Sequence, residues 1–235
     1  MSLKKYFLKN KITYKLYLFY NLYIRHKCFI KRSQYSQWGE DLFITDYFKK
    51  KKSGTYFDVG CFHPIMYSNT CLLYKKGWNG INIDINPTSI DLFDILRPGD
   101  FNLCTTIDEN NLEFKVYFDH PFSPVNTLDK KYYNDSKKIF FQDSSIKFVK
   151  SKSIDEILKL SGTNNVDFLN IDVEGMDLKI LSQLIPNKLH PQLISVETHN
   201  VDGSKSNECD KIHELLKNSN YKLYKRIGPT TLYTI

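Results

Sequence analysis

Acidic residues recur along this chain at points where a short hydrophobic run gives way to a turn. They are Asp58, Asp84, Asp108, Asp172 and Glu197. Burying a carboxylate without a partner is costly, so core packing alone would not select this set. A helix cap explains one such acid but not five. Because ligands of open α/β sheets bind beyond the carboxyl ends of the strands, we expect these acids to border a ligand site.

The turn after the first of these runs carries a single glycine, Gly60. A dinucleotide fingerprint needs three closely spaced glycines to approach a pyrophosphate, and the sequence has no Walker-type loop. One glycine therefore suits a nucleoside ligand without phosphates. Asp84 would accept hydrogen bonds from the ribose hydroxyls of such a ligand. An NAD-dependent oxidoreductase is the alternative enzyme, and the missing glycines disfavour it.

The elements that would position these acids alternate along the chain. Hydrophobic runs predict buried strands at residues 55–60, 80–85, 101–107, 166–171 and 192–197. Helical patterns lie at residues 37–52, 69–76, 89–96, 153–160, 176–184 and 208–218. This alternation is typical of an α/β fold with a doubly wound parallel sheet. Strands at 221–226 and 230–234 would close the chain as an antiparallel pair.

The middle of the chain interrupts this alternation. Residues 112–118 alternate as a half-exposed strand does, and residues 146–149 resemble an edge strand. The residues between them, 119–145, are polar and aromatic without a clear period. We expect a long surface loop there, and loops of that length in compact domains are usually functional or disordered.

The N-terminal segment, residues 1–32, holds nine Lys or Arg and no acid. Leu16, Phe19, Tyr20, Tyr23 and Ile24 recur in it at helical spacing. We expect a helix that packs on the domain or on a partner subunit through this stripe. The alternative is an interfacial helix lying on an anionic membrane surface. The apolar stretch is too short to span a bilayer.

Charge and cysteine usage bound the class of protein. Residues 1–52 carry a balance of +10 and the remaining chain −3, so the basic character is local and no nucleic-acid partner is expected. A non-catalytic protein that binds nucleic acid or a membrane surface through this segment is the alternative outside the enzymes. The five cysteines form no C-x-x-C pair, so we expect reduced thiols in a cytoplasmic protein.

Six short blocks in order carry a resemblance to a known family. They are residues 36–41 (SQWGED), 57–64 (FDVGCFHP), 68–70 (SNT), 77–84 (GWNGINID), 97–100 (RPGD) and 167–175 (DFLNIDVEG). Together they resemble the FkbM family of methyltransferases. The resemblance covers residues 33–235, which we take as the methyltransferase domain, and leaves out the N-terminal segment. Several blocks in sequence are more specific than any one motif.

The resemblance implies a Rossmann-like, seven-stranded sheet, mostly parallel with an antiparallel final strand, and S-adenosylmethionine as the methyl donor. It also implies an O-methyltransferase for a hydroxyl of a sugar, a polysaccharide or a related small molecule. By the same resemblance, Asp58, Gly60 and Cys61 lie in the turn under the amino-acid end of the cofactor. Asp84 lies at its ribose, and Ile85 and Asp108 lie by its adenine. Gln37 and Asp172 complete the expected cofactor contacts.

Methyl transfer to a hydroxyl needs in-line positioning and a group that takes the hydroxyl proton. The candidate catalytic residues are His199, Glu174 and His63, of which His199 follows the last predicted parallel strand. A solvated loop histidine is an equally good interpretation of His199, and shaping the cofactor turn is the alternative role of His63. Asp172, Glu174 and His199 could also hold a divalent metal, but the spacing does not require one, and we predict none.

Overall fold

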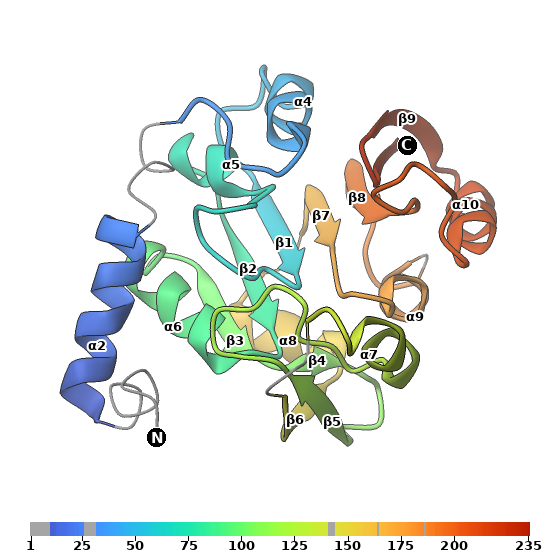
Figure 1. Cartoon of the computed structure of the whole chain (residues 1–235). Coiled ribbons are helices and arrows are strands. Elements are labelled where there is room, and N and C mark those ends of the chain that lie inside the picture. Colours follow the sequence, from blue (N-terminus) through green and yellow to red (C-terminus); the bar gives the residue numbers. More distant parts are fainter. Residues whose placement is uncertain (1–9, 26–31, 141–143, 164, 186) are drawn as a thin grey trace.

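A seven-stranded sheet forms the centre of the molecule (Figure 1). The computed structural model describes residues 10–25, 32–140, 144–163, 165–185 and 187–235. The strand order is β3-β2-β1-β7-β8-β10-β9. The strands are β1 Thr55–Val59, β2 Asn79–Asp84, β3 Phe101–Cys104, β7 Phe168–Ile171, β8 Leu193–Glu197, β9 Lys222–Ile227 and β10 Thr230–Thr234.

The direction of these strands confirms the predicted sheet. Strands β3, β2, β1, β7 and β8 run parallel to one another, whereas β10 runs antiparallel to β8 and to β9. The chain proceeds outward from β1 through β2 to β3, and then outward from β7 through β8. The strand order therefore reverses between β1 and β7, and a ligand site is expected beyond their carboxyl ends.

Helices cover both faces of this sheet, because successive strand residues point to opposite sides. Helices α8 Ile154–Ser161, α9 Asp177–Leu184 and α10 Cys209–Asn218 pack on the face that includes Phe57. Helices α4 Glu40–Tyr47 and α5 Cys71–Lys75 pack on the face that includes Tyr56. The helix predicted at 37–52 is shorter than expected, because it begins only after the left-handed Gly39 (φ +94°) and ends at Tyr47.

The strand predicted at 101–107 is divided at Thr105. Strand β3 pairs with β2, whereas β4 Thr106–Ile107 joins a second sheet of order β4-β6-β5 with β5 Glu113–Phe118 and β6 Ser145–Lys152. The N–H of Thr105 donates to Asp84 O (3.0 Å), and its hydroxyl donates to Lys150 O (2.8 Å). Thr105 thus joins the two sheets at the end of β2.

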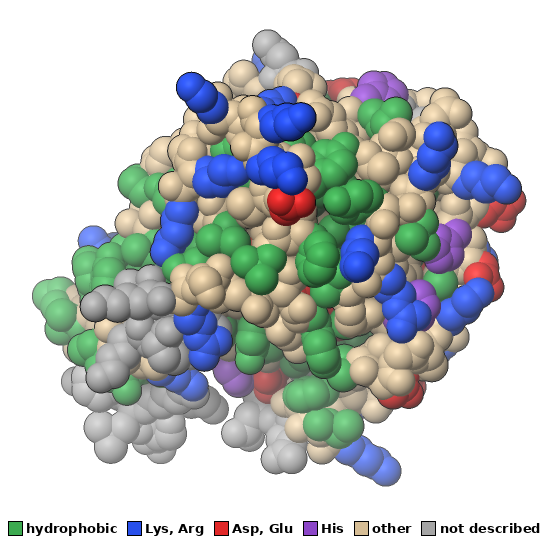
Figure 2. All heavy atoms as spheres, turned by 90° about the horizontal axis from the view of Figure 1, so that it is seen from above, with side chains coloured by type: hydrophobic (Ala, Val, Ile, Leu, Met, Phe, Trp, Pro, Cys, Tyr) green, Lys and Arg blue, Asp and Glu red, His purple; other side chains and the backbone are tan. Residues whose placement is uncertain are grey.

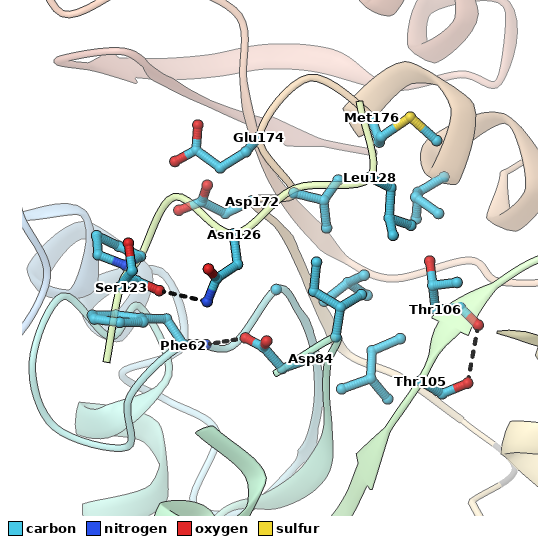
Figure 3. A pocket seen from close by; sticks show the side chains of 17 residues that line it. Phe62, Asp84, Thr105, Thr106, Ser123, Asn126, Leu128, Asp172, Glu174 and Met176 are labelled. Atoms are coloured by element: carbon cyan, nitrogen blue, oxygen red, sulfur yellow. Dashed lines mark hydrogen bonds between the residues drawn. The ribbon is translucent and has the colours of Figure 1, made fainter. Parts of the chain in front are cut away.

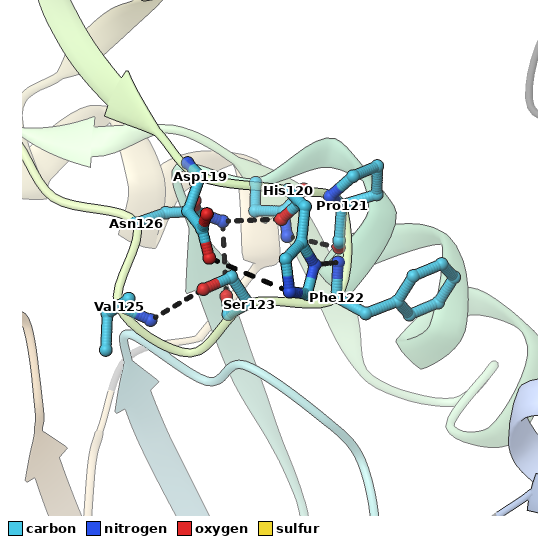
Figure 4. A network of polar contacts seen from close by, with 8 residues as sticks. Asp119, His120, Pro121, Phe122, Ser123, Val125 and Asn126 are labelled. Carbon is cyan, nitrogen blue, oxygen red and sulfur yellow. Dashed lines mark hydrogen bonds and ion pairs between the residues drawn. The ribbon is translucent and has the colours of Figure 1, made fainter. Parts of the chain in front are cut away.

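The described residues of the range 119–145 are more structured than the predicted surface loop. They include α7 Lys130–Ser136, and Thr127 pairs with Tyr117 of β5. Within the turn before it, the Asn126 amide donates to His120 O and Ser123 O and accepts from Asp119 N–H (Figure 4). The sequence did not predict α7 because none of its residues is buried, so it has no hydrophobic period.

The N-terminal segment does form a helix on the domain, but not through the predicted stripe. Helix α2 Lys11–Tyr20 continues into a π-helical turn, Asn21–Arg25. Leu18 and Leu22 are buried against Leu92 of α6 Pro87–Leu96, whereas all five residues of the predicted stripe are exposed. Large apolar residues occur all round this helix, so their spacing could not select the docked face. Residues 1–9 and 26–31 of the segment lie outside the described residues.

Two further expectations concern the environment of the protein. Cys61, Cys71, Cys104 and Cys209 are free thiols, as predicted, while Cys28 lies outside the described residues. No helix in the described parts of the chain is long and apolar enough to cross a membrane.

The packing of α2 gives a first testable prediction. Leu22→Ala removes a fully buried side chain and should lower the free energy of unfolding by about 2–5 kcal/mol. Leu16→Ala, on the exposed face of the same helix, should change it by no more than about 0.5 kcal/mol. Urea unfolding of both variants measures the difference. Equal, small effects would show that α2 does not pack on α6 in solution.

Candidate active site

Three adjoining cavities lie beyond the carboxyl ends of β1, β2, β7 and β8, where the strand order reverses. Asp84 lines the first cavity, Asp58 the second and His199 the third. Asp172 lines the first and second cavities, Glu197 lines the second and third, and Glu174 lines all three. The sequence predicted acids at this edge of the sheet. The structure adds that two of them, Asp172 and Glu197, lie with Glu174 where the cavities meet.

The first cavity has an empty volume of about 570 Å³ and is mostly apolar. Figure 3 shows Asp172 and Glu174 at one end of it, Thr105 and Thr106 at the other, and Asp84 between them. The predicted Gly60 and Ile85 also line it. One wall of this cavity is formed by the segment that was predicted to be a surface loop. Its residues there are Ser123, Pro124, Asn126 and Leu128.

Asp84 is held in place by two backbone donors. Phe62 N–H donates to its Oδ2 (2.8 Å) and Asn86 N–H to its Oδ1 (2.7 Å). Burial raises the pKa of this carboxyl to about 6, against the lowering effect of those two hydrogen bonds. Each oxygen keeps a free lone pair, so the ionised group can accept two hydroxyl donors from a bound ligand.

Gly60 occupies the one position in this turn where no side chain fits. Its φ is +83°, and a Cβ there would lie 1.8 Å from the Asp172 carbonyl oxygen. The Gly60 N–H donates to Ile83 O (2.9 Å), which ties the turn to β2. The close approach brings the end of β1 next to the end of β7, and so places Asp172 beside both cavities.

The second cavity is polar and contains three more of the predicted contacts, Gln37, Asp58 and Cys61. Asp58 is buried at its base, where the Thr70 hydroxyl (2.7 Å) and the Asn170 amide (2.9 Å) donate to its carboxylate. Burial still raises the pKa of Asp58 above its ordinary value. Asn170 and Asn69, which hydrogen-bond to each other, were not predicted as site residues.

The acids at the junction of the cavities repel one another. Burial, and then the neighbouring Glu197 and Glu174, raise the pKa of Asp172 well above its ordinary value. Burial, and then Asp177 and Glu174, raise the pKa of Glu197 to about 8. Burial also raises the pKa of Glu174, although the Tyr132 hydroxyl hydrogen-bonds to it. This junction therefore favours bound protons or a bound cation.

Glu174 reaches the junction through an unusual backbone conformation. Its φ is +47° and that of Gly175 is +89°, and the Thr127 hydroxyl donates to the Glu174 carbonyl oxygen (2.9 Å). A left-handed conformation outside glycine is costly and occurs often at functional sites. The turn before α7 thus holds the strained segment that presents Glu174.

The third cavity lies between α7 and the segment that follows β8. His199 lines it together with Glu174, Glu197 and Tyr132. The Nδ1 of His199 lies 2.8 Å from the Thr198 hydroxyl, which is itself 2.6 Å from the Thr231 hydroxyl. Burial and the nearby Arg226 lower the pKa of His199, which keeps the imidazole neutral and able to accept a proton.

Two predicted site residues do not line these three cavities. The backbone N–H groups of Ile65 and Met66 donate to Nδ1 of His63, and its Nε2 lies 3.3 Å from Asn21 Oδ1, so His63 is buried between its own turn and the N-terminal segment. Asp108 accepts from the N–H of Asn110 (3.0 Å) and lies 3.9 Å from the Lys179 ammonium. The geometry supports neither His63 as the base nor Asp108 as an adenine contact.

The types of side chain at Asp172, Glu174 and His199 would also suit a divalent metal ion. Within the described ranges, no three His, Cys, Asp or Glu side chains are arranged to hold a metal ion.

The fold and this site together define an α/β protein with cavities at the carboxyl ends of β1 and β7. The sequence model of the methyltransferase FkbM domain matches residues 54–223, well over half of the chain. The chain therefore belongs to the FkbM methyltransferase family and is a methyltransferase. Comparison with curated proteins and with solved structures gave no match.

The geometry of Asp84 gives a prediction for cofactor binding. Asp84→Ala should weaken binding of S-adenosylmethionine by about 1.5–3 kcal/mol, the range for hydrogen bonds to a charged group. Asp108→Ala is the matched control and should leave the affinity unchanged. With the native chain, the affinity should fall about tenfold per pH unit below pH 6, because the carboxyl must then lose a proton to accept from the ribose.

Calorimetric titration of the two variants and of the native chain from pH 5 to pH 8 measures these effects. An equal loss of affinity in Asp84→Ala and Asp108→Ala would contradict the expected contact between Asp84 and the ribose of the cofactor.

Proposed function

We propose that this chain uses S-adenosylmethionine to methylate a hydroxyl of a sugar or a related small molecule. The observation that carries the proposal is the junction of Asp172, Glu174 and Glu197 between the cavities. Buried carboxylates that repel one another are stabilised by a positive ligand, and this cofactor carries a positive sulfonium and a positive ammonium group. The negative pyrophosphate of NAD would be repelled by the same acids.

The lining residues fit the cofactor from end to end. Asp84 would hold the ribose hydroxyls, with Ile85, Thr105 and Thr106 around the adenine in the first cavity. The amino-acid end would extend into the second cavity, past Asp172 to Gln37 and Asn69. Asp58, almost fully buried at the base of this cavity, would hold Asn170 in place by accepting a hydrogen bond from its amide. We place this arrangement in a Rossmann-like, doubly wound fold.

The third cavity is the proposed acceptor site. Its lining includes carboxylate, amide and hydroxyl groups from Asp129, Tyr132, Glu197 and Asn200, the kinds of groups that hold a polyhydroxylated ligand. When bound, the sulfonium supplies an electrophilic methyl group and a good leaving group. The protein contributes alignment of the acceptor oxygen and removal of its proton. Within this proposal the protein works in the cytoplasm, which its free thiols support.

His199 is the proposed general base. It faces the acceptor cavity, its pKa is lowered so that it is neutral, and Thr198 fixes its ring. It would take the hydroxyl proton as the bond from oxygen to carbon forms. Glu174 lies at the inner end of the same cavity, where its carboxylate would orient the acceptor hydroxyl and balance the developing imidazolium charge.

Proton release on cofactor binding tests the electrostatic argument. At pH 7 the Glu197 carboxyl, with a pKa of about 8, holds a proton in the free protein. A cation bound beside it lowers that pKa, so binding of S-adenosylmethionine should release protons. Calorimetry at pH 7 in two buffers of different ionisation enthalpy measures the number released.

Two comparisons make this test specific. S-adenosylhomocysteine lacks the sulfonium charge and should release fewer protons, and Glu197→Gln should reduce the release caused by S-adenosylmethionine. Proton uptake, or equal release with both ligands, would exclude the acid junction as the site of the sulfonium. Binding of NAD in place of S-adenosylmethionine would overturn the proposed function.

Substitution of the proposed base gives a separate prediction. With an acceptor found by screening simple glycosides, His199→Ala should lower kcat by ~10²–10⁴-fold, the usual contribution of a general base. The affinity for S-adenosylmethionine should hold, because the imidazole acts in the transition state. The exposed His190 serves as the control, and His190→Ala should retain full activity. Unchanged turnover in His199→Ala would leave Glu174 as the group that removes the proton.

A further inference from the structure

Helix α2 and the turn after it expose a row of large apolar side chains, which we call the outer face of α2. It consists of Ile12, Leu16, Phe19, Tyr20, Tyr23 and Ile24. Ile12 is 71% exposed, Leu16 64% and Ile24 60%. Single exposed apolar residues are ordinary on a protein surface, but six on one short segment form a patch. Figure 2 shows hydrophobic side chains gathered at the edge of the molecule where α2 lies.

The outer face is held in a fixed orientation by the opposite side of the helix. Leu18 and Leu22 are buried against Leu92, and the Tyr14 hydroxyl donates to the Asp91 carboxylate. The exposed residues cannot turn inward without breaking these contacts. The segment therefore has two apolar sides. One packs on the domain, and the other is exposed.

The charges around the outer face indicate the kind of surface. Residues 1–32 hold nine Lys or Arg and no acid, and Lys11, Lys15 and Arg25 among them are exposed. Lys11 and Lys15 line the groove between α2 and α6 together with Asp91 and Asp94, so the excess of positive charge belongs to the segment as a whole. Exposed aromatic and aliphatic residues flanked by cations are typical of helices that lie in the headgroup layer of an anionic bilayer.

We propose that the outer face of α2 binds the surface of an anionic lipid bilayer, with the helix axis in the plane of the membrane. A second copy of the chain would bring two such cationic segments together, and their repulsion disfavours that partner. A nucleic acid would satisfy the cations but would leave the aliphatic side chains of Ile12, Leu16 and Ile24 without an apolar environment.

The position of α2 leaves the proposed acceptor site open. In Figure 1, α2 lies at the opposite edge of the molecule from α7 and α9, which border the third cavity. A bilayer under α2 would therefore hold the enzyme without covering that cavity. The proposal rests on α2 alone and is independent of the proposed function.

Co-sedimentation of the full chain with vesicles tests the proposal. We expect binding to vesicles that contain phosphatidylglycerol and phosphatidylcholine, and much weaker binding to phosphatidylcholine alone. Phe19→Glu and Leu16→Glu should each abolish most of the binding to anionic vesicles. Phe148→Glu, at an exposed aromatic residue of β6 (62%, against 50% for Phe19), is the matched control and should bind as the native chain does.

A second pair of variants tests the contribution of the lysines to vesicle binding. Replacing Lys11 and Lys15 by Gln should lower the partition coefficient about fivefold for each lysine. The same change at Lys49 and Lys50, exposed lysines beyond the end of α4, should have little effect. Circular dichroism of each variant confirms that the fold is retained.

Three results would overturn the proposal. The first is no binding to anionic vesicles. The second is equal binding of Phe19→Glu and the native chain, which would show a charge effect that needs no apolar face. The third is a dimer in sedimentation equilibrium that Phe19→Glu dissociates, which would make a second copy the occupant.

Discussion

A guanidinium with almost no access to solvent holds the first turn of the sheet in place. Arg97 donates to the hydroxyls of Thr70 (2.8 Å) and Ser68 (2.9 Å) and to Pro64 O (2.6 Å). The Thr70 hydroxyl in turn donates to Asp58. A buried charge without such partners would be strongly destabilising, so the segments that supply them are fixed together. Those segments are the turn after β1 and the start of α5.

The same residue connects β1 to β2 on the other side. Arg97 also donates to the Tyr56 hydroxyl, which donates to Asp100, and Asp100 accepts from Gly80 N–H and the Asn82 amide. These contacts explain why the block at 97–100 accompanies the blocks at 57–64 and 77–84 in the sequence. None of its residues lines the cavities that Asp84 and Asp58 border, yet both of those carboxylates depend on the turn that it supports.

Stability and function are opposed at the acid junction. Burial of Asp172, Glu174 and Glu197 raises the pKa of each. Ionisation of all three carboxyls would therefore destabilise the folded protein when no ligand is bound. Two features of the backbone bring these acids together. Gly60 allows β1 and β7 to approach closely, and the left-handed conformation at Glu174 directs that residue to the junction. A cationic ligand would stabilise the ionised carboxylates, and the cofactor proposed for this chain is such a ligand.

The seven-stranded sheet with an antiparallel last strand was implied by the resemblance to the FkbM family, whereas the residues by themselves determined the α/β class and the acids at the strand ends. Those features depend on local hydrophobic period and on residue type, which are both readable along the chain. The tertiary structure alone decided which acids meet, since Asp172, Glu174 and Glu197 come together across strands while Asp108 turns to Asn110 and Lys179. It also decided which face of α2 is docked, and that the turn at 123–128 forms one wall of the first cavity. Side-chain direction at strand ends, and the choice between two apolar faces of one helix, depend on contacts between residues far apart in the chain, and no local pattern contains them.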